Sequence, residues 1–305
     1  MRTVPAAILA LLLASVICAA SPPPAKLIIL TSILPLEEFA ADVAGERGEV
    51  SLLLPPGAGV HTWQPRPGDI MRLASAHLFI SVGANLEPWL KDVLAAIPEG
   101  KVRVLEVSRG LTLMPAPEES GKEASHGHGA LDPHVWLDFG LDETIVDGIE
   151  STLAELDPAG KSYFQANAAA LKDRLRRLDE EFRTGLAPCA GREFILAGHD
   201  AFGYLARRYG LVQRSLYGLS PDSQPKPQDV MAVVDEARRT GVKTIFTESS
   251  VPRGLAETLA RETGARVLSL SAAHNLTREE IRRGLGFFDI MREDLRSLRE
   301  GLGCR

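Results

Sequence analysis

The sequence predicts an α/β protein with two lobes of parallel β-sheet, which a long rigid helix joins. Apolar, β-rich runs alternate with helical patterns in two successive sets along the chain. This alternation is typical of parallel sheets whose strands are connected by helices. One long stretch of helical periodicity lies between the two sets, so we expect each set to form its own lobe.

Eight runs account for the predicted strands, four in each set. The first set comprises Leu27–Ile33, Val50–Leu54, His77–Val82 and Val102–Val107. The second set comprises Glu193–Ala197, Leu211–Leu216, Lys243–Thr247 and Arg266–Leu270. Helix-like segments separate the runs within each set, which indicates crossover connections and parallel pairing rather than hairpins.

The helix between the sets is predicted from about Pro158 to Leu186. Its apolar residues recur mostly three, four or seven positions apart, at Phe164, Leu171, Leu175, Leu178, Phe182 and Leu186. Asp157 and Pro158 are suitable for its start, and Gly185 and Pro188 for its end. About 28 residues at 1.5 Å each give a rod of about 42 Å, which would restrict relative motion of the lobes. The alternative is an ordinary long helix inside a single domain.

The N-terminus predicts export from the cytoplasm. Arg2 is followed by an apolar run, Ala6–Ile17, and then by the small residues Ala19 and Ala20, as in a cleaved secretory signal. The run is too short to span a bilayer as a mature helix. Cys18 offers the alternative of a lipid anchor, but Ile17 is bulky where a lipoprotein signal normally has a small residue.

These features divide the chain into four expected parts. Residues 1–20 form the signal peptide, 26–156 the N-terminal lobe, 157–187 the linker helix and 188–305 the C-terminal lobe. The formal net charge is -6, so the chain has no electrostatic footprint for nucleic acid.

Two cysteines, Cys189 and Cys304, remain after removal of the signal. In an oxidising compartment we expect them to form a disulfide, and two unpaired thiols are the alternative. The bridge would close nearly the whole second half of the chain, and loop entropy predicts a contribution of about 4–5 kcal/mol, less any strain.

Three histidines each lie where a predicted strand gives way to a loop or turn. They occur in the sequences His61-Thr62-Trp63-Gln64-Pro65, Asp132-Pro133-His134-Val135-Trp136-Leu137-Asp138 and Gly198-His199-Asp200-Ala201-Phe202-Gly203. Open α/β sheets bind ligands beyond the carboxyl ends of their strands. Imidazoles that converge there, two from the first lobe and one from the second, suit Zn²⁺ in the cleft between the lobes.

Any single loop histidine is more often solvated or hydrogen-bonded than a metal ligand, so only the set of three indicates a site. Metal-bound histidines normally donate their other ring nitrogen to an outer acceptor. Asp138 and Asp200 are near enough in sequence for this role, although both also fit as acids at the start of a helix.

Several ordered segments resemble one family, the solute-binding proteins of zinc and manganese ABC transporters (metal-binding cluster A-I). The segments are ILPLEEFAADVAG, GVHTWQPRPGDI, AHLFISVGANLEPWL, DPHVWLD, GHDAFGYLARRYGL and IFTESSVPRGLAETLARETG, and they cover essentially the whole mature chain. The resemblance implies two (β/α) lobes, a rigid connecting helix and a metal between the lobes. It also implies metal ligands at His61, His134 and His199.

The resemblance further implies zinc rather than manganese. Family members specialised for manganese tend to have a carboxylate at the position of His199, and imidazole suits Zn²⁺ better than the harder Mn²⁺. Zinc receptors of the family often have a His-rich acidic loop before the second ligand. His126 and His128 resemble a shortened version of that loop, which would collect metal at low affinity; a solvated polar loop is the alternative reading.

One segment departs from the family pattern, at Leu270-Ser271-Ala272-Ala273-His274-Asn275, where an aspartate usually follows the last strand. The fourth ligand is therefore open among His274, water and Glu248. His274 also has a structural reading, because it leads into Thr277-Arg278-Glu279-Glu280, which fits a helix capping box.

The predicted function is extracytoplasmic capture of Zn²⁺ and its delivery to an ABC-type membrane permease by a monomeric, periplasmic, non-enzymatic receptor. The alternatives are a manganese receptor or metal-dependent adhesin of the same family. A zinc hydrolase would also use three histidines and an open position, but the sequence has no His-Glu-x-x-His motif that would place a general base.

Overall fold

Two four-stranded parallel sheets form the framework of the computed structural model, which describes residues 26–116, 131–216, 227–248 and 254–305. The first sheet contains β1 (Leu27–Thr31), β2 (Gly48–Leu52), β3 (Leu78–Ser81) and β4 (Arg103–Glu106). The second contains β5 (Glu193–Ala197), β6 (Val212–Ser215), β7 (Thr244–Glu248) and β8 (Arg266–Leu270). The sequence-based prediction of eight strands in two parallel sheets is therefore confirmed.

Both sheets have the same connectivity. Their strand orders are β2-β1-β3-β4 and β6-β5-β7-β8, and every pairing is parallel. In each sheet the second strand in sequence pairs on one side of the first strand. The third and fourth strands follow on the other side. The connections therefore diverge at the carboxyl ends of β1 and β3 in one sheet and of β5 and β7 in the other, and open α/β sheets bind their ligands at such switch points.

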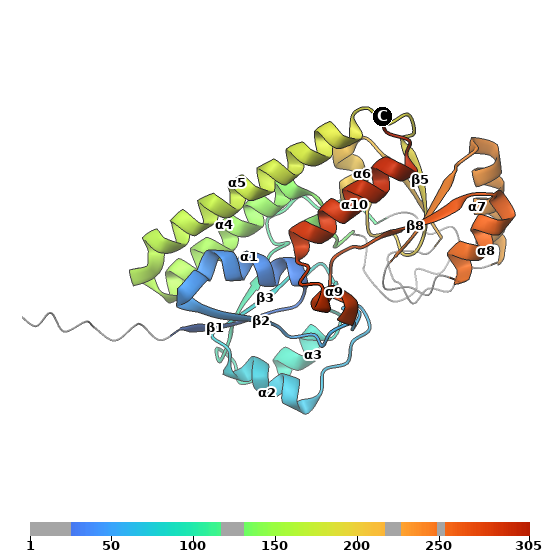
Figure 1. Ribbon diagram of the computed structural model, residues 1–305. Helices are drawn as coiled ribbons and strands as arrows, with labels where there is room; N and C mark the ends of the chain where they lie inside the picture. The colour runs from blue at the N-terminus through green and yellow to red at the C-terminus, as the bar shows by residue number, and fades with distance from the viewer. Residues whose placement is uncertain (1–25, 117–130, 217–226, 249–253) are drawn as a thin grey trace, which may run out of the picture.

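Helices of both halves cover these sheets, as Figure 1 shows. The N-terminal half contains α1 (Leu34–Ala44), α2 (Pro67–Ser75), α3 (Leu90–Ala95) and the 3-10 turns η1 (Gly45–Arg47) and η2 (Val135–Leu137). The C-terminal half contains α6 (Gly203–Tyr209), α7 (Pro227–Thr240), α8 (Gly254–Thr263), α9 (Arg278–Arg282) and α10 (Phe287–Gly301). The capping box predicted at the start of α9 is confirmed, since the Glu280 amide donates to the Thr277 hydroxyl and the Thr277 amide donates to the Glu280 carboxylate.

A helical hairpin joins the two sheets. The predicted long helix is α5 (Lys161–Leu186), and its apolar stripe from Phe164 to Leu186 is buried. It lies beside α4 (Phe139–Leu156), from which only Asp157 and the short turn η3 (Pro158–Gly160) separate it (Figure 1). The connection therefore consists of two antiparallel helices, where the sequence had indicated one. At 1.5 Å per residue, α5 alone is about 39 Å long.

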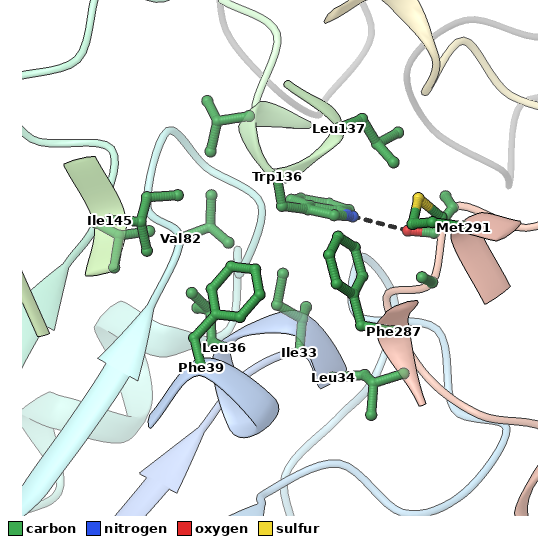
Figure 2. Packing of buried hydrophobic residues seen from close by; sticks show 14 of the residues in the cluster. Ile33, Leu34, Leu36, Phe39, Val82, Trp136, Leu137, Ile145, Phe287 and Met291 are labelled. Atoms are coloured by element: carbon green, nitrogen blue, oxygen red, sulfur yellow. Dashed lines mark hydrogen bonds between the residues drawn. The ribbon is translucent and has the colours of Figure 1, made fainter. Parts of the chain in front are cut away.

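The C-terminal helix α10 returns across this hairpin. It packs against α5, β8 and α1, so the last helix of the chain contacts the first (Figure 1). Figure 2 shows Phe287 and Met291 of α10 beside Phe39 of α1 and Trp136 of η2. The rings of Phe39 and Phe287 meet edge to face, with centroids 5.3 Å apart. One hydrophobic cluster thus continues from the first sheet to the second. A smaller, separate cluster, which includes Ile195, Ile245 and Leu259, packs between the second sheet and helices α7 and α8.

The division into lobes at 26–156, 157–187 and 188–305 stays a prediction. The contact of α10 with α1 shows that the last part of the chain also packs on the N-terminal half. The predicted signal peptide at residues 1–20, with Cys18, lies outside the described residues, and so do His126 and His128. Among the described helices, none is both long enough and apolar enough to cross a membrane.

The predicted disulfide between Cys189 and Cys304 is confirmed. It joins residues 115 positions apart and connects the turn before β5 to the end of the chain after α10. Because α10 contributes Phe287, Met291 and Leu298 to the core, the bridge holds a helix whose burial already stabilises the fold.

Replacing both Cys189 and Cys304 by Ser is expected to lower the free energy of unfolding by about 3–5 kcal/mol, because a long loop in the unfolded chain is no longer closed. Urea denaturation of the oxidised proteins measures the difference. Wild-type protein treated with a reductant is the matched control and should resemble the double variant. Equal stability of the oxidised wild type and the variant would contradict the expectation.

Candidate metal centre

His61, His134 and His199 come together between the two sheets. Their side chains are buried, and one nitrogen from each ring lies within 4.8 Å of the others. The ring centroids are 5.7 Å apart for His61 and His134, 5.5 Å for His61 and His199, and 5.2 Å for His134 and His199. Nitrogens bound to one tetrahedral Zn²⁺ at 2.0–2.1 Å lie about 3.4 Å apart, so small movements suffice to coordinate an ion.

Each histidine reaches this point from a different connection. His61 lies in the loop after β2, His134 immediately precedes η2, and His199 follows the carboxyl end of β5. The loop of His61 is held within its own half by Trp89, whose indole Nε1 donates to the Val60 carbonyl at 3.0 Å. The indole of Trp89 also meets that of Trp63 edge to face, with centroids 4.9 Å apart.

Asp132 orients the ring of His134. Its carboxylate Oδ1 lies 2.8 Å from His134 Nδ1 and accepts the His134 amide at 3.0 Å. An acceptor on Nδ1 fixes the tautomer, and Nε2 then becomes the ligand nitrogen. Burial lowers the pKa of His134, although the Asp132 carboxylate opposes this shift. The ring is therefore neutral at pH 7, as metal binding requires.

Glu248 has the same role for His199. It ends β7, and its Oε2 lies 2.7 Å from His199 Nδ1, while its Oε1 accepts the His199 amide at 2.5 Å. Gly198 makes this approach feasible, because a Cβ at that position would collide with the Glu248 carboxylate. Burial lowers the pKa of His199, but the carboxylates of Glu248, Asp200 and Asp132 together outweigh it, with Glu248 contributing most, and the net shift of the pKa is upward.

The two acceptors differ from those suggested by the sequence. The carboxylate of Asp138 caps α4 by accepting the Gly140 amide at 3.0 Å, and it pairs with Arg208 at 2.7 Å. Asp138 therefore has the alternative role that the sequence offered, an acid at the start of a helix, and its outer role at a ligand ring stays a prediction. Asp200, whose carboxyl hydrogen-bonds to Ser215, stays an untested candidate for an outer role. Sequence reasoning missed Asp132, although Asp-x-His spacing was the available signal.

Arg208 connects its own helix, α6, which follows His199, to α4 and α5, which follow His134. Besides Asp138 it binds Asp179 of α5 with two nitrogens, Nε at 2.6 Å and Nη2 at 2.9 Å. Tyr209 donates its hydroxyl to the same Asp179 carboxylate at 2.7 Å. Such forked pairs fix direction as well as distance, so this network holds α6 against α4 and α5.

His274 lies at the margin of the cluster. Its ring centroid is 6.4 Å from that of His61 and 6.3 Å from that of His199. Burial, reinforced by the neighbouring His199, lowers the pKa of His274 to about 4, so its ring is neutral and able to donate a lone pair. Glu248, the other side chain considered for the fourth position, already binds His199 through both of its oxygens.

The fold and this centre define a class: a two-lobed α/β binding protein with a buried, histidine-rich site between its lobes. The chain belongs to the family described as zinc-uptake complex component A, periplasmic (ZnuA), whose model matches residues 29–301.

Characterised relatives agree with this membership. The chain is 34% identical over 284 residues to the high-affinity zinc uptake system protein ZnuA of Bacillus subtilis, covering 91% of this chain and 88% of that protein. It is 31% identical over 287 residues to the zinc-binding protein AdcA of Streptococcus pyogenes, covering 90% of this chain but only 56% of that longer protein.

Solved structures share the fold. The Zn(II)-bound ZnuA-like domain of Streptococcus pneumoniae AdcA matches with a TM-score of 0.77 and 29% identity, covering 91% of this chain and 99% of that one. The laminin-binding protein Lmb of Streptococcus agalactiae, described as having adhesin and metal-transporting activity, matches with a TM-score of 0.79 and 30% identity, covering 91% of this chain and all of that one (100%).

Replacing Glu248 by Gln is expected to lower the pKa of His199, because burial would then act without the opposing carboxylate. The amide keeps an oxygen for the His199 backbone. In the wild type, the raised pKa of His199 adds to the free energy of unfolding at low pH. This contribution is lost as the pH rises through the pKa of His199 in the folded protein, and the variant should lack it. NMR titration of the imidazoles in metal-free protein measures the shift. Glu236→Gln, at an exposed pair with Arg239, is the control. An unchanged pKa of His199 in Glu248→Gln would argue against the assignment.

Proposed function

We propose that this protein captures Zn²⁺ outside the cytoplasm and delivers it to an ABC-type membrane permease. The observation that carries the proposal is the convergence of three buried imidazoles, those of His61, His134 and His199. They come from connections in both halves of the chain, so an ion bound to all of them would also hold the halves together. The zinc-uptake family and its zinc-binding relatives support this cargo.

The donor set favours Zn²⁺ over Mn²⁺. Nitrogen donors suit the softer Zn²⁺, whereas Mn²⁺ prefers carboxylate and water oxygen. In this centre the carboxylates of Asp132 and Glu248 bind the outer nitrogens of the histidines. They raise the basicity of the rings and leave the inner positions to nitrogen.

For the fourth position we propose His274, with water as the alternative. The ring of His274 is neutral and lies beside two of the three proposed ligands. Glu248 fits a supporting role better than direct ligation, because both of its oxygens are engaged by His199.

A receptor explains the centre better than a zinc hydrolase does. Hydrolysis at zinc needs a general base beside the metal-bound water. Glu248 is the candidate for a general base, but both of its carboxylate oxygens contact His199, so it positions that ring. The family itself is one of zinc-uptake components, and we propose that this chain has no catalytic activity.

The remaining parts of the proposal concern location and partners. A cleaved signal would place the protein in the periplasm, and anchoring to the membrane through Cys18 is the alternative. We propose that the protein acts there as a monomer. His126 and His128, which lie outside the described residues, would supply a second, weak zinc site. Adhesion stays a second candidate activity, because the structure of Lmb is described as that of an adhesin and metal transporter.

Replacing His61, His134 or His199 by Ala is expected to weaken Zn²⁺ binding by at least about 100-fold, since loss of a direct ligand costs more than loss of an outer partner. Calorimetric titration against a competing chelator measures the affinity, and circular dichroism checks the fold. His77→Ala is the matched control, because His77 lies outside the centre and accepts the Ile28 amide. A triple variant with wild-type affinity would refute the site.

Replacing His274 by Ala separates the candidates for the fourth position. If His274 is a ligand, the affinity for Zn²⁺ should fall about 10- to 100-fold, and the visible absorption of the Co²⁺-substituted protein should change as one nitrogen donor is lost. If affinity and spectrum both stay at wild-type values, water occupies that position.

A further inference from the structure

The segment from Ser271 to Leu276, between β8 and α9, bonds to several parts of the N-terminal half. The indole of Trp136 donates to the Ala272 carbonyl at 2.7 Å, a bond drawn as a dashed line in Figure 2. The Leu34 amide donates to the His274 carbonyl at 3.1 Å. The segment thus forms a direct connection between the halves beside the candidate metal centre.

Asn275 makes the connection to the loop that carries His61. Its side-chain Nδ2 donates to the Pro55 carbonyl at 2.9 Å and to the Ala58 carbonyl at 2.8 Å. The amide of Gly57, between these two residues, donates to the Leu276 carbonyl at 2.9 Å. Three hydrogen bonds therefore join residues 275–276 to residues 55–58.

The position of the Asn275 carboxamide is itself fixed. Its Oδ1 accepts the Leu276 amide at 2.7 Å, which directs the two N–H groups of Nδ2 toward the loop. Two residues earlier, Ala273 has φ 55, in the left-handed region that non-glycine residues rarely adopt. Ala273 is buried, and its amide donates to the Ser271 hydroxyl, so the surrounding structure holds this turn in place.

The loop held in this way is exposed where it leaves β2. Pro55, Pro56 and Gly57 are exposed, whereas His61 a few residues later is buried in the centre. Trp89 fixes the loop to its own half through Val60, and Asn275 fixes it to the other half. If His61 and its loop moved away from a bound ion, the hydrogen bonds from Asn275 to the Pro55 and Ala58 carbonyls would have to break.

We propose that Asn275 is a positioning residue for zinc binding: its carboxamide holds the His61 loop against the segment that carries His274 and so slows the release of Zn²⁺. The inference rests on the proposed zinc-receptor function. A primary amide suits this position because one nitrogen supplies two donors to two carbonyls. A carboxylate of the same shape would place oxygen against both carbonyls and repel them.

The test is the rate at which Zn²⁺ leaves the full-length protein for an excess of chelator, followed by stopped flow in Asn275→Ala and Asn275→Asp. Loss of two hydrogen bonds of about 1 kcal/mol each corresponds to a release about 30-fold faster. The rate of Zn²⁺ association should stay within about twofold of wild type, because most effects of this kind appear in dissociation. Asn275→Asp, which is isosteric, should release Zn²⁺ at least as fast as Asn275→Ala.

Thr277→Ala is the matched control for local destabilisation. Thr277 is two residues from Asn275, and the substitution removes the hydrogen bond that the Glu280 amide donates to the Thr277 hydroxyl. It should lower stability by about 1 kcal/mol, with no change in Zn²⁺ release. Asn275 variants that release Zn²⁺ at the wild-type rate would overturn the proposal while leaving the receptor function intact. If Thr277→Ala accelerated Zn²⁺ release as much as the Asn275 variants do, Asn275 would have only a structural role, and the proposal would also be overturned. Wild-type protein that binds no Zn²⁺ would overturn both proposals.

Discussion

The bonds from Asp132 to His134 and from Glu248 to His199 constrain much of the architecture around the centre. Burying several imidazoles together is unfavourable unless the rings are neutral or compensated by charge. The Asp132 carboxylate hydrogen-bonds to Nδ1 of His134, and the Glu248 carboxylate lies 2.7 Å from Nδ1 of His199, so both carboxylates favour Nε2 as the inward-facing nitrogen. Glu248 can do so only because β7 ends beside β5 in the strand order of the second sheet.

The halves of the molecule are joined on two sides of this centre. On one side the Asp138–Arg208–Asp179 network holds α6 to α4 and α5, close to where His134 and His199 enter. On the other side Asn275 and Leu276 bind the loop of His61. The first attachment is ionic and forked, and the second consists of neutral bonds to an exposed loop. The neutral bonds on the His61 side therefore cost less to break than the ionic pairs on the other side.

Periodicity and strand-end logic predicted most of the fold and the three histidines from the sequence. The runs that became β5 and β8 have the predicted bounds, and the stripe of α5 is buried as expected. The pairing of α4 with α5 was not predicted, because a helix start at Asp138 was considered only as an alternative. Asp132, the acceptor beside His134, was missed, and Glu248 was considered near the site but was not assigned to His199. Glu248 reaches His199 across 49 residues of chain, and only the strand order brings them together.

The disulfide determines where the chain can be modified without disturbing the centre. Cys304 is bonded beside the amino end of β5, whereas His199 follows its carboxyl end. The strand between these two ends has five residues and is about 17 Å long at about 3.3 Å per residue. In Figure 1 the C-terminus lies beyond the far ends of α5 and α10. A fluorophore or a surface tether attached at Arg305 would lie at the opposite end of β5 from His199, which makes this position suitable for building an immobilised sensor.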